Sequence, residues 1–141
     1  MTLKIAAIGF AHGHIYGQVS TLLDAGAELV SYYDDEAHRI AQFAERFPQG
    51  KLAESIEQIL EDERIDIIVS AAIPKDRAPL GVQAMRHGKD YFVDKPAFAT
   101  LAQLEEVRRV QAETGQFYTV FFSEHYSTTA TVKASELVKA G

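Results

Sequence analysis

Apolar residues along this chain follow two alternating patterns. Short β-branched runs of strand length recur, and several lack polar alternation, as strands covered on both faces of a parallel sheet do. Between these runs, apolar residues recur at helical spacing, as Ile40, Phe43, Ala44 and Phe47 do at i, i+3, i+4 and i+7. The runs predict strands at residues 3–8, 29–33, 51–53, 66–72, 91–93 and 117–122.

Helix-start and helix-stop signals fall between the predicted strands. Ser55 and Thr100 each open a capping-box pattern with a glutamine three residues later, and Gly88 follows a helical stretch. We expect that stretch to begin at Arg77, which places Pro79 in its first turn, where proline is tolerated. The predicted helices cover residues 15–25, 40–47, 55–61, 77–87, 101–114 and 130–138.

Strands and helices therefore alternate about six times, the pattern of right-handed βαβ units. This predicts the α/β class: a doubly wound parallel sheet with helices on both faces and strand order 3-2-1-4-5-6. We expect one domain over residues 1–126. Residues 127–141 are expected to be a helical connection that leads toward a further domain.

Composition narrows the function classes. The 141 residues carry a net charge of −6 with no basic block, which argues against a nucleic-acid binder. The chain has no cysteine, so it offers neither disulfides nor thiolate metal ligands. It has no long apolar run that would span a membrane and no signal-peptide pattern, so we expect a cytoplasmic protein without a membrane partner.

The stretch 9–14, Gly-Phe-Ala-His-Gly-His, lies between the first predicted strand and the first predicted helix. A glycine turn at this place brings helix N–H groups to a dinucleotide pyrophosphate. The usual pattern is G-x-G-x-x-G, and here alanine and histidine stand at its second and third glycine positions. The candidate cofactor-binding residues of this loop are Gly9, Phe10, Ala11, His12, Gly13 and His14.

Asp34 ends the second predicted strand. An acid roughly 20 residues beyond a glycine loop is placed to bind the ribose hydroxyls, and it would repel a 2′-phosphate. The cofactor is therefore expected to be NAD or NADP, with NAD favoured. The alternative is that Asp34 or Asp35 caps the following helix.

Asp94-Lys95-Pro96 directly follows the fifth predicted strand. A lysine at a strand end can donate hydrogen bonds to a substrate oxygen and, if partly desolvated, handle a proton. The alternative is a surface lysine in an ordinary turn. Arg77 is expected either to reach a phosphate or substrate carboxylate, or to be a solvated charge.

His12 and His14 suggest a metal site, but the sequence shows no third ligand beside them, so we expect none. We expect these histidines to flank the phosphates or cap the helix. Glu124 and His125 belong to the exit from the sixth predicted strand, and a cofactor-facing role for them stays open.

The order of these motifs resembles that of the Gfo/Idh/MocA oxidoreductases, the glucose–fructose oxidoreductase and inositol dehydrogenase group. The resemblance covers essentially the whole chain. It rests on the glycine loop, Asp34 with Arg39, Ala72-x-Pro74, Gly88-Lys89 and Asp94-Lys95-Pro96.

The resemblance implies hydride transfer between NAD(P) and a sugar, polyol or similar hydroxyl compound. It places Lys95 beside nicotinamide and substrate, as the catalytic residue. It also implies a second domain that supplies the acid/base and the subunit interface, so that the full-length protein is a homo-oligomer and this stretch alone is inactive. The further cofactor-binding residues it implies are Arg39, Ala72, Ile73, Pro74, Arg77, Asp94, Lys95 and Pro96.

Three positions beyond the glycine loop depart from the family pattern. Lys75 stands for its asparagine, Arg77 for its histidine, and Asp94 for its usual glutamate. The altered glycine loop keeps a rival open, a non-catalytic dinucleotide-binding sensor or interaction module of the same fold. A Rossmann domain for another nucleotide, such as S-adenosylmethionine, would also suit Asp34, but it leaves Asp94-Lys95-Pro96 unexplained.

Overall fold

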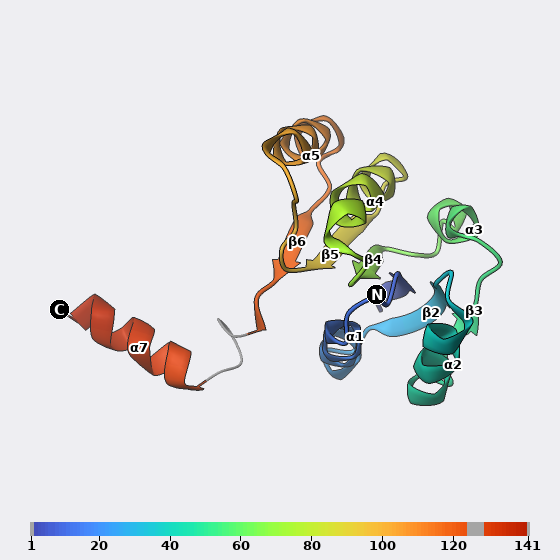
Figure 1. Cartoon of the computed structure of the whole chain (residues 1–141), viewed down its shortest axis with the longest axis horizontal. Helices are drawn as coiled ribbons and strands as arrows, with labels where there is room; N and C mark the ends of the chain where they lie inside the picture. Colours follow the sequence, from blue (N-terminus) through green and yellow to red (C-terminus); the bar gives the residue numbers. More distant parts are fainter. Residues whose placement is uncertain (1, 124–128, 141) are drawn as a thin grey trace.

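Six parallel strands form the centre of the molecule, in the order β3-β2-β1-β4-β5-β6 (Figure 1), which confirms the predicted doubly wound sheet. The computed structural model describes residues 2–123 and 129–140. The strands are β1 (Lys4–Ile8), β2 (Glu28–Tyr33), β3 (Lys51–Leu52), β4 (Ile67–Ser70), β5 (Asp90–Asp94) and β6 (Tyr118–Phe121).

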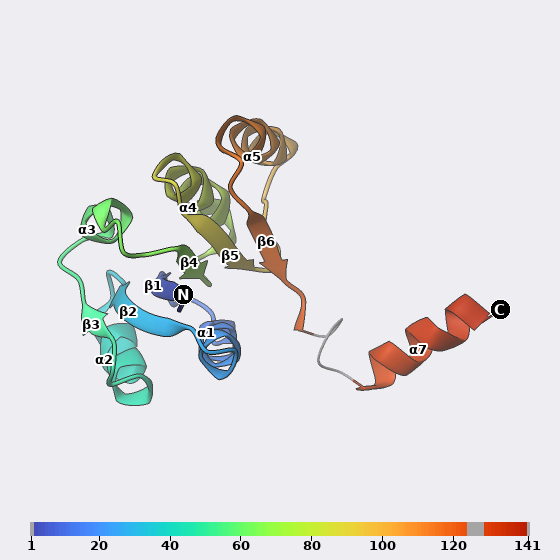
Figure 2. The same ribbon diagram turned by 180° about the vertical axis from the view of Figure 1, so that it is seen from behind.

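Helices cover both faces of this sheet. Helices α1 and α2 lie on one face, and α3, α4 and α5 lie on the other (Figures 1 and 2). Helix α7 projects away from the sheet. The helices are α1 (His14–Asp24), α2 (Ala37–Arg46), α3 (Ile56–Glu61), α4 (Pro74–Arg86), α5 (Leu101–Thr114) and α7 (Thr129–Ala140).

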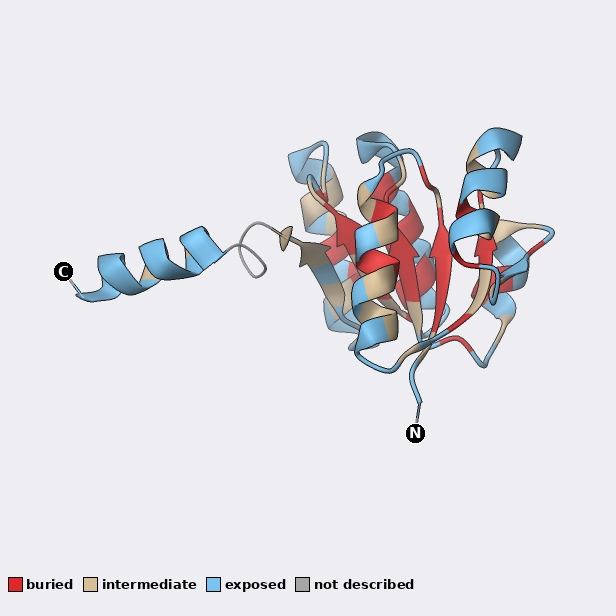
Figure 3. Ribbon diagram, turned by 90° about the horizontal axis from the view of Figure 1, so that it is seen from below, coloured by how far each residue is buried: buried red, intermediate tan, exposed pale blue. Residues whose placement is uncertain are grey.

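Strand β1 shows why the strands read as continuous apolar runs. Its residues Ile5 and Ala7 pack with α1 and α2, whereas Ala6 and Ile8 pack with α3 and α4. All four are buried, and the central strands form the buried interior of the molecule (Figure 3). Helix cover on both faces removes any reason for polar alternation.

The predicted capping boxes are confirmed. The side chains of Ser55 and Thr100 each accept a hydrogen bond of 3.2 Å from the backbone amide three residues later. The glutamine at that position reaches back to the amide preceding the cap residue, at 2.7 Å in both helices. These local bonds satisfy N–H groups that a helix start leaves without partners.

The predicted start of α4 is wrong. The helix begins at Pro74, three residues before Arg77, so Pro79 lies inside it. Proline has no N–H, and it therefore leaves the carbonyl of Lys75 without its helical partner. The side chain of Gln103 on α5 donates to this oxygen at 2.9 Å, which restores the missing bond.

The C-terminal helix forms as the sequence predicts, but its apolar side chains remain exposed. Leu137 and Val138 are both exposed, and α7 buries no residue. The expected domain boundary at residue 126, and the residues Glu124 and His125, lie outside the described residues. Within the described chain, no helix has the length and apolarity needed to cross a membrane.

Candidate functional site

The carboxyl ends of β1, β2, β4 and β5 lie along one edge of the sheet, where ligands bind in doubly wound folds. Most of the candidate residues follow these strand ends. The structure separates them into two groups. One surrounds a cavity between the β1, β2 and β4 ends, and the other surrounds the carboxylate of Asp94 at the end of β5.

Gly9 makes the turn that follows β1. Its φ is +77°, and a Cβ at this position would lie 2.8 Å from the Cβ of Ala72. The turn is fixed on both sides, because the Gly9 amide donates to Tyr33 O and the Gly9 carbonyl accepts from Ala71 N, both at 3.0 Å. Both the backbone conformation and the close approach therefore require glycine here.

Asp34 anchors the glycine loop from the end of β2. It is 4% exposed, and one carboxylate oxygen accepts from Phe10 N at 2.6 Å. The other accepts from Glu36 N at 2.9 Å and from Arg39 Nε at 2.8 Å. Burial raises the pKa of Asp34, but the hydrogen bonds from Phe10, Glu36 and Arg39 outweigh it, and the pKa lies below its usual value.

The alternative that Asp34 or Asp35 caps α2 is wrong, whereas the cofactor-binding role of Phe10 stays a prediction. The residue that caps α2 is Glu36, without a side-chain cap bond, so neither Asp34 nor Asp35 is the N-cap. Phe10 does not face the cavity side of the loop. Its ring is buried and stacks on Phe43 at a centroid distance of 4.2 Å, while its amide is taken by Asp34. Phe10 thus holds the loop to the core.

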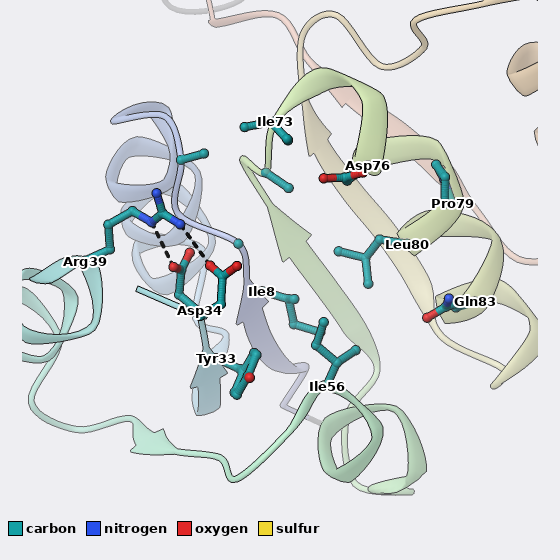
Figure 4. Close-up of a pocket in the computed structure, with 14 residues that line it drawn as sticks. Ile8, Tyr33, Asp34, Arg39, Ile56, Ile73, Asp76, Pro79, Leu80 and Gln83 are labelled. Atoms are coloured by element: carbon teal, nitrogen blue, oxygen red, sulfur yellow. Dashed lines mark hydrogen bonds and ion pairs between the residues drawn. The ribbon is translucent and has the colours of Figure 1, made fainter. Parts of the chain in front are cut away.

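A cavity of about 430 Å³ lies beside Asp34 and Arg39 (Figure 4). Near β2 its polar lining is formed by these two residues and Asp35, and on the α4 side by Asp76 and Gln83. Its wall includes apolar side chains of Ile56 and Leu80. The candidate residues that line it are Gly9, Ala11, Asp34, Arg39, Ala72 and Ile73. The sequence did not point to the two wall residues, because apolar positions in predicted helices carry no mark of the face they present.

The start of α1 offers unpaired backbone donors. Within the part of the chain that the structure describes, the amides of Ala11 and Gly13 have no intramolecular partner. Gly13 is the N-cap of α1, and both residues are exposed. Free amides at the positive end of a helix dipole bind anions.

Asp94 is the centre of the second group. It is 1% exposed, and its Oδ1 lies 2.9 Å from His14 Nδ1. Its Oδ2 accepts from Arg77 Nη2 at 3.1 Å and lies 3.5 Å from His12 Nδ1. The third ligand-type residue that the sequence did not show beside the two histidines is therefore Asp94.

Arg77 requires a correction. It is 2% exposed, so the solvated alternative is wrong. Its guanidinium also donates to the carbonyls of Ala72 at 2.6 Å and of Asp94 and Pro96 at 3.1 Å. These bonds hold the loop before α4 against the loop after β5. The structure thus shows Arg77 positioning these two loops, and its contact with a phosphate or a substrate carboxylate stays a prediction.

Lys95 lies in the loop that Arg77 holds. It is half-buried, follows the buried Asp94 and precedes Pro96 through a cis peptide bond. Pro74 is exposed as the first residue of α4. None of these three residues lines the cavity beside Asp34. The roles of Lys95, Pro74 and Pro96 stay predictions.

Comparison with known proteins places this geometry among oxidoreductases. Residues 3–122 match the family model GFO_IDH_MocA, described as an oxidoreductase family with an NAD-binding Rossmann fold. A crystal structure from Erwinia carotovora atroseptica SCRI1043, of a protein described as an oxidoreductase, is 42% identical. It superposes with a TM-score of 0.95 over 99% of this chain and 42% of that chain.

Two curated relatives have named activities. A scyllo-inositol 2-dehydrogenase (NAD(+)) from Bacillus subtilis (strain 168) is 28% identical over 99% of this chain and 41% of its own length. A D-xylose dehydrogenase from Paenarthrobacter nicotinovorans is 29% identical over 55% of this chain and 20% of its own length. The chain thus spans about two fifths of the first relative.

Proposed function

This chain belongs to the Gfo/Idh/MocA oxidoreductase family, with its NAD-binding Rossmann fold, and on that premise we propose that it binds NAD(P) for a dehydrogenase. The reaction is hydride transfer between the nicotinamide and a hydroxyl-bearing carbon of a sugar, polyol or related compound. The names of the inositol and xylose dehydrogenase relatives support this substrate class.

The observation that carries the proposal is the cavity between the ends of β1, β2 and β4. It has apolar walls for an adenine and a carboxylate, Asp34, at its edge for ribose hydroxyls. The free amides of Ala11 and Gly13 are at the start of α1, in the same loop that supplies Gly9 and Ala11 to the cavity. A pyrophosphate there would receive hydrogen bonds and the positive end of the helix dipole.

Charge at the cavity edge favours NAD over NADP. Asp34 and Asp35 both pair with the single guanidinium of Arg39, which leaves the trio net negative. A 2′-phosphate would bring two further negative charges to this edge. Like charges disfavour each other most strongly where solvent is partly excluded, and Asp34 is buried.

Titration of NADH into the chain, followed by the fluorescence of its nicotinamide, tests the proposal. We expect saturable binding that is tighter for NADH than for NADPH. Ile73→Glu places a negative charge on the cavity wall and should weaken NADH binding roughly tenfold or more. Leu101→Glu, an exposed position outside the cavity, is the matched control and should bind like the parent.

Absence of NADH binding up to millimolar concentration would contradict the proposal. Equal loss of binding in both glutamate variants would indicate that the cavity is not the site.

The resemblance of Asp94-Lys95-Pro96 to the family motif supports Lys95 as the group that orients the substrate oxygen and handles its proton. We further propose that the residues needed for turnover are completed by a second domain and that the complete protein is a homo-oligomer.

In the complete dehydrogenase, Lys95→Ala should lower kcat at least about a hundredfold, since general acid–base groups contribute about that much. The variant should retain NADH binding. Unchanged turnover would refute the role of Lys95, whereas absence of turnover in the complete parent protein would favour the rival, a non-catalytic dinucleotide-binding module.

A further inference from the structure

His12, His14 and Asp94 bring three metal-ligand groups to one point, with one ligand atom from each within 4.8 Å of the others. We propose that these three residues bind a divalent transition-metal ion of the zinc class. The site lies between the loop that precedes α1 and the end of β5, outside the cavity beside Asp34. It does not depend on the proposed dinucleotide function.

Sheet topology makes the site, because β1 and β5 both pair with β4 in a parallel arrangement. Their carboxyl ends therefore emerge on the same edge, one strand apart. His14 begins α1 directly after the β1 loop, and Asp94 ends β5. The two imidazole rings pack edge to face at a centroid distance of 4.3 Å, so both can turn a nitrogen toward the same carboxylate.

The nitrogens nearest the carboxylate are the Nδ1 atoms of both histidines, at 2.9 Å for His14 and 3.5 Å for His12. The backbone amide of His14 also donates to His12 Nδ1 at 3.3 Å. A nitrogen that accepts a hydrogen bond carries a lone pair, which is the form that binds a metal. The hydrogen bond therefore indicates the His12 tautomer that has its lone pair on Nδ1, and a metal would take this lone pair in place of the His14 amide.

The carboxylate has the support that metal ligands require. Arg77 holds Asp94 Oδ2 at 3.1 Å and is itself fixed by three backbone carbonyls, whereas Asp94 Oδ1 faces His14. Outer hydrogen bonds of this kind fix the orientation of ligating carboxylates. Arg77 therefore fixes Asp94 through Oδ2, the oxygen nearest His12, while Oδ1 remains directed at His14.

The three ligand side chains differ in solvent exposure, as expected for a site that a metal ion enters from solvent. The side chains of His12 and His14 are 50% and 31% exposed, whereas Asp94 is 1% exposed. The site has a buried carboxylate as its floor and two imidazoles at the solvent side. Two imidazoles and a carboxylate match the ligand preferences of zinc, cobalt, nickel and iron, and three protein ligands leave a coordination position open.

Titration of the tag-free chain with ZnCl₂ in a calorimeter, without dinucleotide, tests the site. We expect one zinc ion per chain at micromolar affinity. Titration with CoCl₂ provides a second readout, visible d–d absorption from an ion in a protein ligand field. His12→Ala and His14→Ala should each weaken zinc binding roughly tenfold or more and abolish the cobalt bands. Because Asp94 is buried against Arg77, these more accessible histidine positions are the better variants.

His38→Ala and His87→Ala are the matched controls, since both histidines are exposed and outside the cluster. Each should bind zinc like the parent. The proposal is overturned if the parent binds no zinc below millimolar concentration, or if the double variant His12→Ala/His14→Ala binds it as tightly as the parent. In either case the cluster is a hydrogen-bonded His–Asp group only.

Discussion

Asp34 and Asp94 are both buried carboxylates at strand ends, and each pairs with an arginine, yet they do different work. Asp34 finds Arg39 five residues later, and the pair borders an open cavity. Asp94 pairs with Arg77, 17 residues earlier, and with His14, 80 residues earlier. One is a local arrangement beside a ligand cavity, and the other joins segments that are distant in sequence.

The difference shows that, along one edge of the sheet, one carboxylate lines a ligand cavity while the other holds two loops together. Asp34 fixes the glycine loop through a single amide, that of Phe10, and faces the cavity with its arginine. Asp94 and Arg77 have no place on the cavity wall, but together they hold the loop before α4 and the loop after β5. Loss of the first should damage binding more than folding, and loss of the second the reverse.

Arg77→Met should have the largest effect on stability. It keeps most of the side-chain volume but leaves Asp94 as a buried charge without its arginine. It also leaves three backbone carbonyls without their hydrogen-bond donor. Breaking a buried pair in this way costs about 3–5 kcal/mol, measured as the free energy of unfolding in urea. The control Arg86→Met removes an exposed pair with Glu106 and should cost less than about 1 kcal/mol. Equal losses in the two variants would refute the structural role of Arg77.

Asp34→Asn should cost less, about 1.5–3 kcal/mol at neutral pH, because it removes charge-assisted hydrogen bonds to a buried carboxylate. The pKa of Asp34 is lowered by folding, so its ionised form stabilises the fold above the unfolded pKa, near 3.8. That stability disappears as the pH falls from about 4 through the folded pKa. Urea unfolding at a series of pH values should therefore show a shallower acid loss in Asp34→Asn than in the parent.

Asp35→Asn is the matched control for this acid dependence. Asp35 also pairs with Arg39, but its side chain is 80% exposed. Its substitution should change the free energy of unfolding by less than about 1 kcal/mol and leave the acid dependence as in the parent. If both variants lose the same part of the acid dependence, the hydrogen bonds of Asp34 are not its source.

Gly9→Ala should destabilise the fold less than Arg77→Met and Asp34→Asn. We expect a loss of about 1–3 kcal/mol from backbone strain and the contact with Ala72. Gly88→Ala shares the positive φ but meets no atom within 4 Å, and Gly13→Ala has neither problem. Thermal unfolding should therefore rank the losses Gly9→Ala, Gly88→Ala, Gly13→Ala. A Gly13→Ala variant as unstable as Gly9→Ala would contradict the geometry of the turn.

The sequence by itself determined the order of elements, the strand order and the capping boxes. The elements and capping boxes depend on apolar patterns and on hydrogen bonds between residues three or four positions apart, and the strand order follows from their alternation through the right-handed βαβ rule. It also determined Gly9, because a strand followed by a glycine turn is a local signal. Asp34 was found as a candidate in the same way, and its arginine lies within a short stretch of chain.

Only the tertiary structure decided the environment of Asp94. The crossovers between β1 and β5 bring His14, Arg77 and Asp94 together. A sequence pattern does not predict which side chains from distant strand ends come into contact. For the same reason the sequence left the burial of Arg77 undecided and misplaced the start of α4. The bond that tolerates Pro79 inside α4 comes from Gln103 on another helix. Local physics thus determined the elements, while packing of parallel strands decided which charged groups share a site.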